Sequence, residues 1–201
     1  MQIEIRNIKS KDIDVASELL TKNFVEDKGV IVLFKKNDQK YNYRVNQWFK
    51  ATLKMLINNK QNINCALLRD DIVGVSIVTH TSHKPSILSL LKWSYSVLMT
   101  CGMKTVIQTV KHDNFRKKSF TDNNQYILEF IAVNREQRGK GIGRDLFESL
   151  NVLADSKKAS VWLETTKKNN IDIFNKMNYN LIDTKNELSV TYYIMTNEKS
   201  A

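Results

Sequence analysis

The chain has few residues that turn, stiffen or cross-link a backbone, with one proline, six glycines and two cysteines among 201 residues. Cys65 and Cys101 lie far apart in apolar segments, without a CxxC pattern or a histidine-rich neighbour, so we expect neither a disulfide framework nor a metal site. The most apolar segment, 86–101, is shorter than the roughly 20 residues that cross a bilayer, and Lys92 and four serines interrupt it. These features exclude disulfide-rich, metal-cluster and membrane-spanning proteins.

Length and charge further narrow the classes of protein to which the chain can belong. No internal repeat or low-complexity linker divides the chain, so we expect a single domain over residues 1–201. The net charge of +10 favours anionic partners. Because the basic residues are dispersed, we expect neither dedicated nucleic-acid binding nor a membrane partner. The segment from Met1 to Arg6 alternates like a strand and not like a signal peptide, which predicts a cytoplasmic location.

Periodic apolar residues predict an α/β fold. Side-chain alternation predicts strands at 3–8, 64–69, 72–79, 125–133, 160–165, 179–183 and 188–195. Helical spacing predicts helices at 13–24, 45–57, 86–101, 142–157 and 170–177, with a shorter one near 106–110. Residues 25–40 and the basic segment from His112 to Asn124 are expected to be irregular. Residues of about 84–118 would form a helical insertion ahead of the strand at 125–133.

The most informative segment is the strand run ending at Val133 and the turn that follows, Arg138-Gly-Lys-Gly-Ile-Gly-Arg144. Half of the six glycines fall within residues 139–143, where they let the backbone turn tightly and approach a ligand. The helix beginning near Ile142 would aim free N–H groups and its positive dipole end at the turn. With Arg138, Lys140 and Arg144 around it, the turn has the chemistry of a pyrophosphate site.

Residue identities separate this turn from two other phosphate loops. Counting from Gly139, a Rossmann fingerprint needs glycine where Arg144 stands. A Walker A loop needs a Lys-Ser/Thr pair after its last glycine, but Arg144 and Asp145 follow Gly143. The simplest alternative is an ordinary glycine-rich connection between a strand and a helix.

The pattern Arg138-x-x-Gly141-x-Gly143 resembles the coenzyme A loop of the GNAT superfamily of N-acetyltransferases. The predicted order of strands and helices is similar to that fold over most of the chain. Ala154-Asp155, Leu163-Glu164-Thr165 and Asn170 resemble the branch that contains puromycin N-acetyltransferase. The resemblance implies a single-domain fold with a mixed central sheet flanked by helices, and acetyl-CoA as co-substrate.

The resemblance also implies which residues bind the coenzyme. The backbone of Ile131, Ala132 and Val133 would face the pantetheine arm, and a strand N–H such as that of Ile131 or Ala132 would stabilise the oxyanion. The pyrophosphate would be surrounded by Arg138, Gly139, Lys140, Gly141, Ile142, Gly143 and Arg144. Asn170 would reach the pantetheine, a role compatible with capping its helix.

Glu129 is the candidate general base, because it lies on the coenzyme strand two residues before the expected oxyanion donor. Its alternative role is that of a solvent-facing strand residue. Glu164 is a second candidate, for which a structural role is the simpler interpretation. The three histidines, His80, His83 and His112, are expected to be exposed and not catalytic, although His80 ends a strand near the expected acceptor site.

The family's usual tyrosine acid is replaced by Phe174, which cannot protonate the leaving thiolate. Tyr126, Tyr179, Tyr192 or water are left as substitutes. Because a thiol with a pKa of about 8.5 leaves readily as the thiolate, the substitution does not by itself abolish catalysis.

We therefore expect an acetyl-CoA-dependent N-acetyltransferase that acts on a primary amine of a small molecule. The alternatives are a protein acetyltransferase, acting on lysine or an N-terminus, and a non-catalytic coenzyme A-binding regulatory module. The helix at 86–101 is expected to cover the sheet, with Leu90, Leu91 and Leu98 buried and Trp93 or Tyr95 facing an acceptor pocket. The acceptor is not named by the sequence, and the oligomeric state is left open, with a homodimer as one option.

Overall fold

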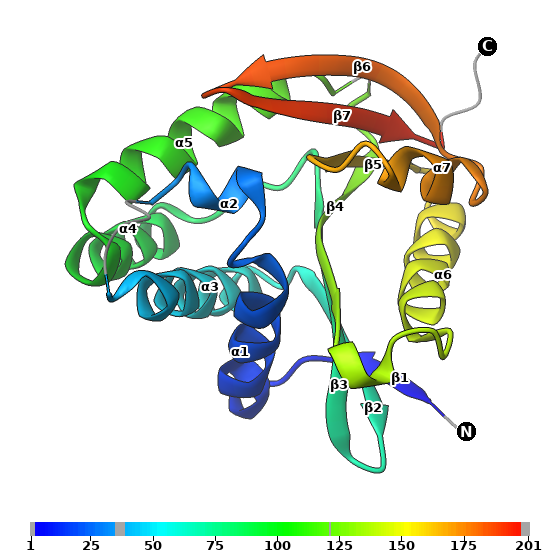
Figure 1. Ribbon diagram of the computed structural model, residues 1–201, viewed down its shortest axis with the longest axis horizontal. Coiled ribbons are helices and arrows are strands. Elements are labelled where there is room, and N and C mark those ends of the chain that lie inside the picture. The colour runs from blue at the N-terminus through cyan, green and yellow to red at the C-terminus, as the bar shows by residue number, and fades with distance from the viewer. Residues whose placement is uncertain (1–2, 35–38, 121, 198–201) are drawn as a thin grey trace.

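The computed structural model describes residues 3–34, 39–120 and 122–197, which form one sheet with helices on both sides (Figure 1). The strands are β1 Glu4–Asn7, β2 Asn62–Leu68, β3 Asp71–His80, β4 Gln125–Val133, β5 Ser160–Thr165, β6 Asn180–Glu187 and β7 Val190–Thr196. The helices are α1 Ile13–Phe24, α2 Lys28–Ile31, α3 Tyr41–Asn58, α4 Ile87–Cys101, α5 Met103–Lys117, α6 Ile142–Ser156 and α7 Asn170–Asn175. Two short 3-10 helices, η1 Ser10–Asp12 and η2 Arg135–Gln137, precede α1 and follow β4.

The strands lie in the order β1-β2-β3-β4-β5-β7-β6. Neighbours run antiparallel except for β4 and β5, which are parallel and pair only from Gln125–Ser160 to Leu128–Leu163. Beyond Leu128, β4 continues to Val133 beside β3 alone. The predicted α/β fold with a mixed central sheet is confirmed, and its central pair of strands separates into a fork.

Residue 129 forms a β-bulge on β4. Along β3, Ile77 pairs with Phe130 and the next residue, Val78, pairs with Leu128, so Glu129 has no partner on that strand. A bulge breaks the alternation of side chains between the two faces of a sheet. Leu128 packs in the core beneath α6, whereas Phe130 packs edge-on against Phe24 of α1, with ring centroids 5.0 Å apart.

The two faces of the sheet have separate cores. Figure 1 shows α6 on one side of β4 and α1, α3, α4 and α5 on the other. The α6 core contains Phe147 and Leu150, and the opposite core is built around Trp48 and Phe49 of α3. Apolar burial on both faces supplies the main driving force for folding. The fork between β4 and β5 lies in the sheet, between these two layers of helices.

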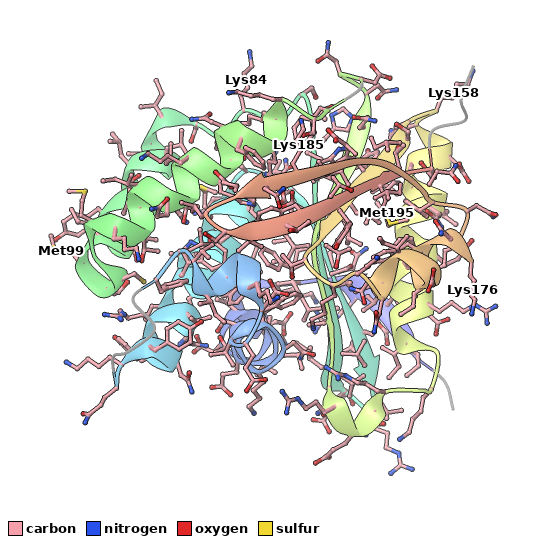
Figure 2. The ribbon with its side chains drawn as sticks, turned by 45° about the horizontal axis from the view of Figure 1, so that its top comes forward. Lys84, Met99, Lys158, Lys176, Lys185 and Met195 are labelled. Carbon is pink, nitrogen blue, oxygen red and sulfur yellow. The ribbon has the colours of Figure 1, made fainter. Side chains whose placement is uncertain are left out.

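Helix α4 packs on α3. Its buried face includes Trp93, which donates its Nε1–H to Thr52 Oγ1 at 3.1 Å, and Val97. Leu90 and Leu91 are 41% and 63% exposed. The prediction that these leucines are buried over the sheet while Trp93 or Tyr95 faces a pocket is therefore wrong for both leucines and for Trp93, because α4 turns its tryptophan side toward α3. In Figure 2, Met99 projects from the outer side of this helical pair.

Helix α5 is longer than the sequence predicted. The helix expected near 106–110 extends from Met103 to Lys117, so the first part of the expected loop from His112 to Asn124 is helical. Polar residues here were mistaken for a loop because their charged partners lie on strands distant in the sequence. Among the described residues, neither α4, α5 nor any other helix is long and apolar enough to cross a membrane.

The segment 25–40 is not wholly irregular. It contains α2, whose N-cap residue Asp27 accepts a hydrogen bond from the Gly29 backbone N–H at 2.9 Å. An aspartate at this position satisfies a backbone donor that has no partner within the helix. Residues 35–38 of the predicted segment lie outside the described residues.

Candidate active site

The fork between β4 and β5 opens one residue beyond the last pair, Leu128–Leu163. The next residue on each strand is a glutamate, Glu129 on β4 and Glu164 on β5. From residue 129 to Val133, the edge of β4 that faced β5 has no strand partner. Such an edge presents backbone N–H and C=O groups that can pair with an extended ligand. The structure places Ile131, Ala132 and Val133 on this edge.

The glycine-rich turn continues from this edge through η2 into α6. Gly139 and Gly141 have φ angles of +76° and +86°, a region that glycine enters without steric cost. A Cβ placed on either residue would meet nothing within 4 Å, so the turn is open above both glycines. Ile142 is buried beneath the turn and packs with Val73 and Leu146, so only its backbone faces the opening.

Backbone donors gather at this turn. Gly141 is the N-cap of α6 and provides no capping side chain. Within the described residues, none of the backbone N–H groups from 139 to 144 donates a hydrogen bond to the protein. These free donors, together with the positive end of the helix dipole, are suited to a phosphate group.

Basic side chains surround the turn. Arg138 donates to Asn23 Oδ1 of α1 at 2.5 Å, and Lys140 donates to Gln137 Oε1 at 2.7 Å. Arg144, in the first turn of α6, is exposed. The seven predicted loop residues are thus brought together, with Ile142 contributing backbone and not side chain.

A hollow of about 530 Å³ lies beside the start of this turn. Its lining includes Leu19 and Lys22 of α1, together with Asn134 and Arg135. No residue of β5, α5 or β7 lines it, so it is distinct from the fork.

Asn170 is the first residue of α7, and the N-cap is its neighbour Asn169. The Asn170 side chain donates to Thr165 Oγ1 at 2.9 Å, which ties the start of α7 to the end of β5. Phe174 stacks on Phe147 of α6, with centroids 5.7 Å apart. The position of the family's usual acid is therefore part of the α6 core in this chain.

The three substitute tyrosines lie in different surroundings. Tyr179 is fully buried and donates to Asn151 Oδ1 at 2.6 Å. Tyr126 lies edge-on to His80 at the start of β4, with centroids 4.9 Å apart. Tyr192 is 2% exposed, and its hydroxyl is buried without a hydrogen-bond partner. Burial, followed by the charges of Glu164 and Glu187, raises the pKa of Tyr192.

Glu129 is held by two side chains. Thr79 donates its hydroxyl to Glu129 Oε1 at 2.6 Å, and the Arg116 guanidinium of α5 binds both carboxylate oxygens, with Nη2 2.8 Å from Oε1. The Glu129 side chain is 12% exposed, so Glu129 is not the solvent-facing residue of the alternative interpretation. Burial opposes the charge of Arg116, but the neighbouring carboxylates, Glu129 first and then Glu164, raise the pKa of Arg116.

His112, one helical turn before Arg116, bridges two further carboxylates. Its Nδ1 lies 2.6 Å from Glu187 Oε2, and its Nε2 lies 3.0 Å from Glu164 Oε1. Because an ionised carboxylate can only accept, both contacts are satisfied together when both ring nitrogens carry protons. Burial opposes this charge, but Glu164 and Glu187 raise the pKa of His112. The expectation of an exposed His112 is wrong.

The other histidines are half-buried. His83 Nε2 is buried without a partner, and burial lowers the pKa of this residue against the opposing charge of Glu129. His80 contacts Ser82 and Asn124 through its two ring nitrogens. Sequence reasoning missed the role of α5, for which the four-residue spacing of His112 and Arg116 was the available signal.

Comparisons with known proteins agree with this geometry. Residues 33–179 match the model of the acetyltransferase (GNAT) family, so the chain belongs to that family. The prediction of this superfamily, and of the acetyl-CoA that it uses as co-substrate, is confirmed at this level. The resemblance to the puromycin N-acetyltransferase branch stays a prediction. No curated protein matches the sequence.

Solved structures share the fold at low sequence identity. One is a structure from Corynebacterium glutamicum described as histone acetyltransferase HPA2 and related acetyltransferase. It has a TM-score of 0.74 and 13% identity, and the match covers 100% of this chain and 98% of the Corynebacterium chain. The PaiA N-acetyltransferase from Thermoplasma acidophilum, solved with coenzyme A, has a TM-score of 0.62 and 13% identity over 99% and 100%. AAC(6')-Ib, solved with ribostamycin and coenzyme A, has a TM-score of 0.59 and 15% identity over 98% and 93%.

Proposed function

We propose that this chain is an N-acetyltransferase that transfers the acetyl group of acetyl-CoA to a primary amine of a small molecule. The observation that carries the proposal is the continuity of the site. The unpaired edge of β4 leads directly into a turn whose backbone donors from 139 to 144 are free. Pantetheine would lie along Ile131, Ala132 and Val133, with the pyrophosphate on the turn and Asn170 beside the arm.

The reaction at the fork is acyl transfer. The lone pair of a neutral amine attacks the thioester carbon and forms a C–N bond, while the carbonyl electrons move to oxygen. A backbone N–H of Ile131 or Ala132 stabilises the resulting oxyanion. When the oxyanion collapses, the C–S bond breaks, the coenzyme A thiolate leaves, and the nitrogen gives up a proton to a base or water.

Glu129 is our proposed base, acting directly or through a water molecule. It lies at the bulge where the fork opens. Its Oε1 accepts from Thr79 and Arg116, whereas its Oε2 accepts from Arg116 alone. A carboxylate oxygen has two lone pairs, so Oε2 retains capacity for an amine N–H or a water.

The position of α5 supports a small acceptor. Its residues bind β4 through Glu129 and bind β5 and β6 through Glu164 and Glu187. Helix α5 therefore bridges the side of the fork that faces away from α6, where an extended peptide would need an open groove. A protein acceptor is the second candidate, because the similar Corynebacterium structure is named for a histone acetyltransferase.

A panel assay tests the proposal. The 201-residue protein is mixed with acetyl-CoA and, in separate reactions, with small primary amines, aminoglycosides or lysine-containing peptides, and free thiol is followed with a chromogenic disulfide. We expect thiol release that depends on one class of small amine. Release with peptides alone would favour the protein acetyltransferase. Tight acetyl-CoA binding without release for any acceptor would favour the regulatory module.

A further inference from the structure

A group of charged side chains lies on the α5 side of the fork. We call it the fork cluster, and its members are His112, Asp113, Arg116, Lys117, Glu129, Glu164 and Glu187. The side chains of Glu129, Glu164, Glu187 and His112 are 12–18% exposed, so the cluster is reached from solvent. Lys185 of β6, visible in Figure 2, donates to Ser119 at 2.7 Å just beyond the end of α5.

The fork cluster lacks one positive charge. Its four carboxylates face three cations when His112 is protonated, and the cation of Lys117 is on the exposed rim, where it binds Asp113. The excess is therefore one negative charge, although the whole chain carries +10. Asp27, at the start of α2, adds a negative field at Tyr192. A partly buried site with this balance favours a cationic ligand.

Among the buried polar atoms without a hydrogen-bond partner are two oxygens on the strands beside the cluster. They are Glu164 Oε2 and the Tyr192 hydroxyl. The His112 ring lies against Tyr192, with centroids 5.0 Å apart, and its Nε2 contacts the other oxygen of Glu164. Buried polar atoms are rarely left without a partner, because the hydration that they lose on burial is then not replaced by a hydrogen bond.

The alternation along the strands brings these groups to one face. On β7, Tyr192 and Ile194 are buried on the same side, and Ile194 packs with Trp162 of β5. Glu164 follows Trp162 by two residues and so shares its face. That face is the one covered by α5, at the mouth of the fork where the thioester of the proposed reaction would lie.

We infer that Glu164 Oε2 and the Tyr192 hydroxyl bind the acceptor as a primary ammonium, and that His112 is the positioning residue for Glu164. The inference rests on the proposed function and names the acceptor class as a cationic amine. An ammonium has three donors, of which two can satisfy the two unpartnered oxygens. Its charge supplies the cation that the fork cluster lacks. The third N–H of the ammonium remains for Glu129 or for a water molecule. Either of them accepts this proton, and the neutral amine that results then attacks the thioester.

Steady-state kinetics with the best amine of the panel tests this inference. Glu164→Gln should raise the KM of the amine by roughly ten- to a hundredfold, the range of a charge-assisted hydrogen bond. Tyr192→Phe should raise it by roughly two- to tenfold. The KM of acetyl-CoA should change by less than about twofold in both, because neither residue lies on the coenzyme edge. Glu148→Gln and Tyr43→Phe, at exposed positions on α6 and α3, are the matched controls.

A neutral inhibitor separates charge from shape. The alcohol that replaces the amine by a hydroxyl should inhibit wild type and Glu164→Gln with similar Ki values, whereas the amine should distinguish them. For His112→Gln, the KM of the amine should rise toward that of Glu164→Gln while kcat changes less. A structural defect alone would lower the active fraction, and hence kcat, without raising the KM of the amine.

Each outcome decides between the inference and the proposed function. If wild type acetylates amines but Glu164→Gln and Tyr192→Phe leave the amine KM unchanged, the inference is wrong and the function stands. If wild type acetylates no amine, the proposed function itself fails. Tyr192→Phe guards against a folding artefact, because removing an unpartnered buried hydroxyl should leave the melting temperature unchanged or raised.

Discussion

At the scale of single residues, Glu129 has two roles that one substitution would confound. Glu129→Gln should lower turnover by roughly ten- to a thousandfold at neutral pH if the carboxylate is the base. It also breaks the ion pair with Arg116 and leaves that guanidinium bound to Asp113 alone, which costs up to about 3–5 kcal/mol of stability. The double variant Glu129→Gln/Arg116→Met removes the pair together and should recover stability but not turnover. Full turnover in the double variant would show that Glu129 is structural.

His112 gives stability a pH dependence. Its pKa in the folded protein is raised above the unfolded value of about 6.5. The stabilisation is therefore fully present below about pH 6.5 and is lost as pH rises through the folded-state pKa. The groups that face the ring are Glu164, Glu187, Arg116 and Tyr192. Melting temperatures measured from pH 6.5 upward should fall with pH in wild type and less steeply in His112→Gln; equal slopes would refute the imidazolium.

His83 acts in the opposite direction and in a different pH window. Its lowered pKa means that the unfolded chain binds a proton more readily than the folded protein. The stability that the folded protein gains by keeping His83 neutral is present above about pH 6.5 and is lost as pH falls below that value. Measurements above pH 6.5 therefore report mainly on His112.

At the scale of elements, the turn before α6 offers a matched pair of glycines. Gly141→Glu should abolish acetyl-CoA binding, because its carboxylate would occupy the space above the free N–H groups. Gly102, between α4 and α5, has the same open surroundings and a φ of +88°, so Gly102→Glu carries the same backbone strain away from the site. Calorimetry should show binding lost in the first and kept in the second. Unchanged affinity in folded Gly141→Glu would contradict the phosphate role of the turn.

The elements differ in how far the sequence alone predicts them. The predicted strands at 125–133 and 160–165 agree with β4 and β5 to the residue, because a buried strand can be recognised from its own run of apolar residues. The second half of α5 was missed, because the burial of Arg116 depends on Glu129 across the fork. The buried face of α4 was also mistaken. With apolar residues on most sides, that helix could not be oriented without knowing that α3 covers its Trp93 side.

The site residues show the same limit. The glycines of the turn could be predicted because tight backbone geometry selects glycine locally. The pairing of Glu164 with His112 and the packing of His112 on Tyr192 are contacts between residues 52 and 80 positions apart, which no local spacing encodes. The fork itself follows from where β4 and β5 stop pairing.

At the scale of the whole molecule, coenzyme binding should stabilise the fold, because the ligand would join the layer of α6 to the free edge of β4. A ligand that binds only the folded state adds about 2.7 kcal/mol at a concentration of 100 times its Kd. The melting temperature should therefore rise with acetyl-CoA in wild type and in Gly102→Glu. It should not rise in Gly141→Glu. A rise of equal size in Gly141→Glu would place the coenzyme elsewhere.

The central claim, acetyl transfer from acetyl-CoA to a small amine at the fork, is tested most directly by product stoichiometry. Coenzyme A thiol and acetylated amine are quantified in the same reaction of wild-type protein, with mass spectrometry for the amide. The account predicts one amide for each thiol released, and neither product above background without the protein. Thiol without amide, or bound acetyl-CoA with neither product for any small amine, would contradict it.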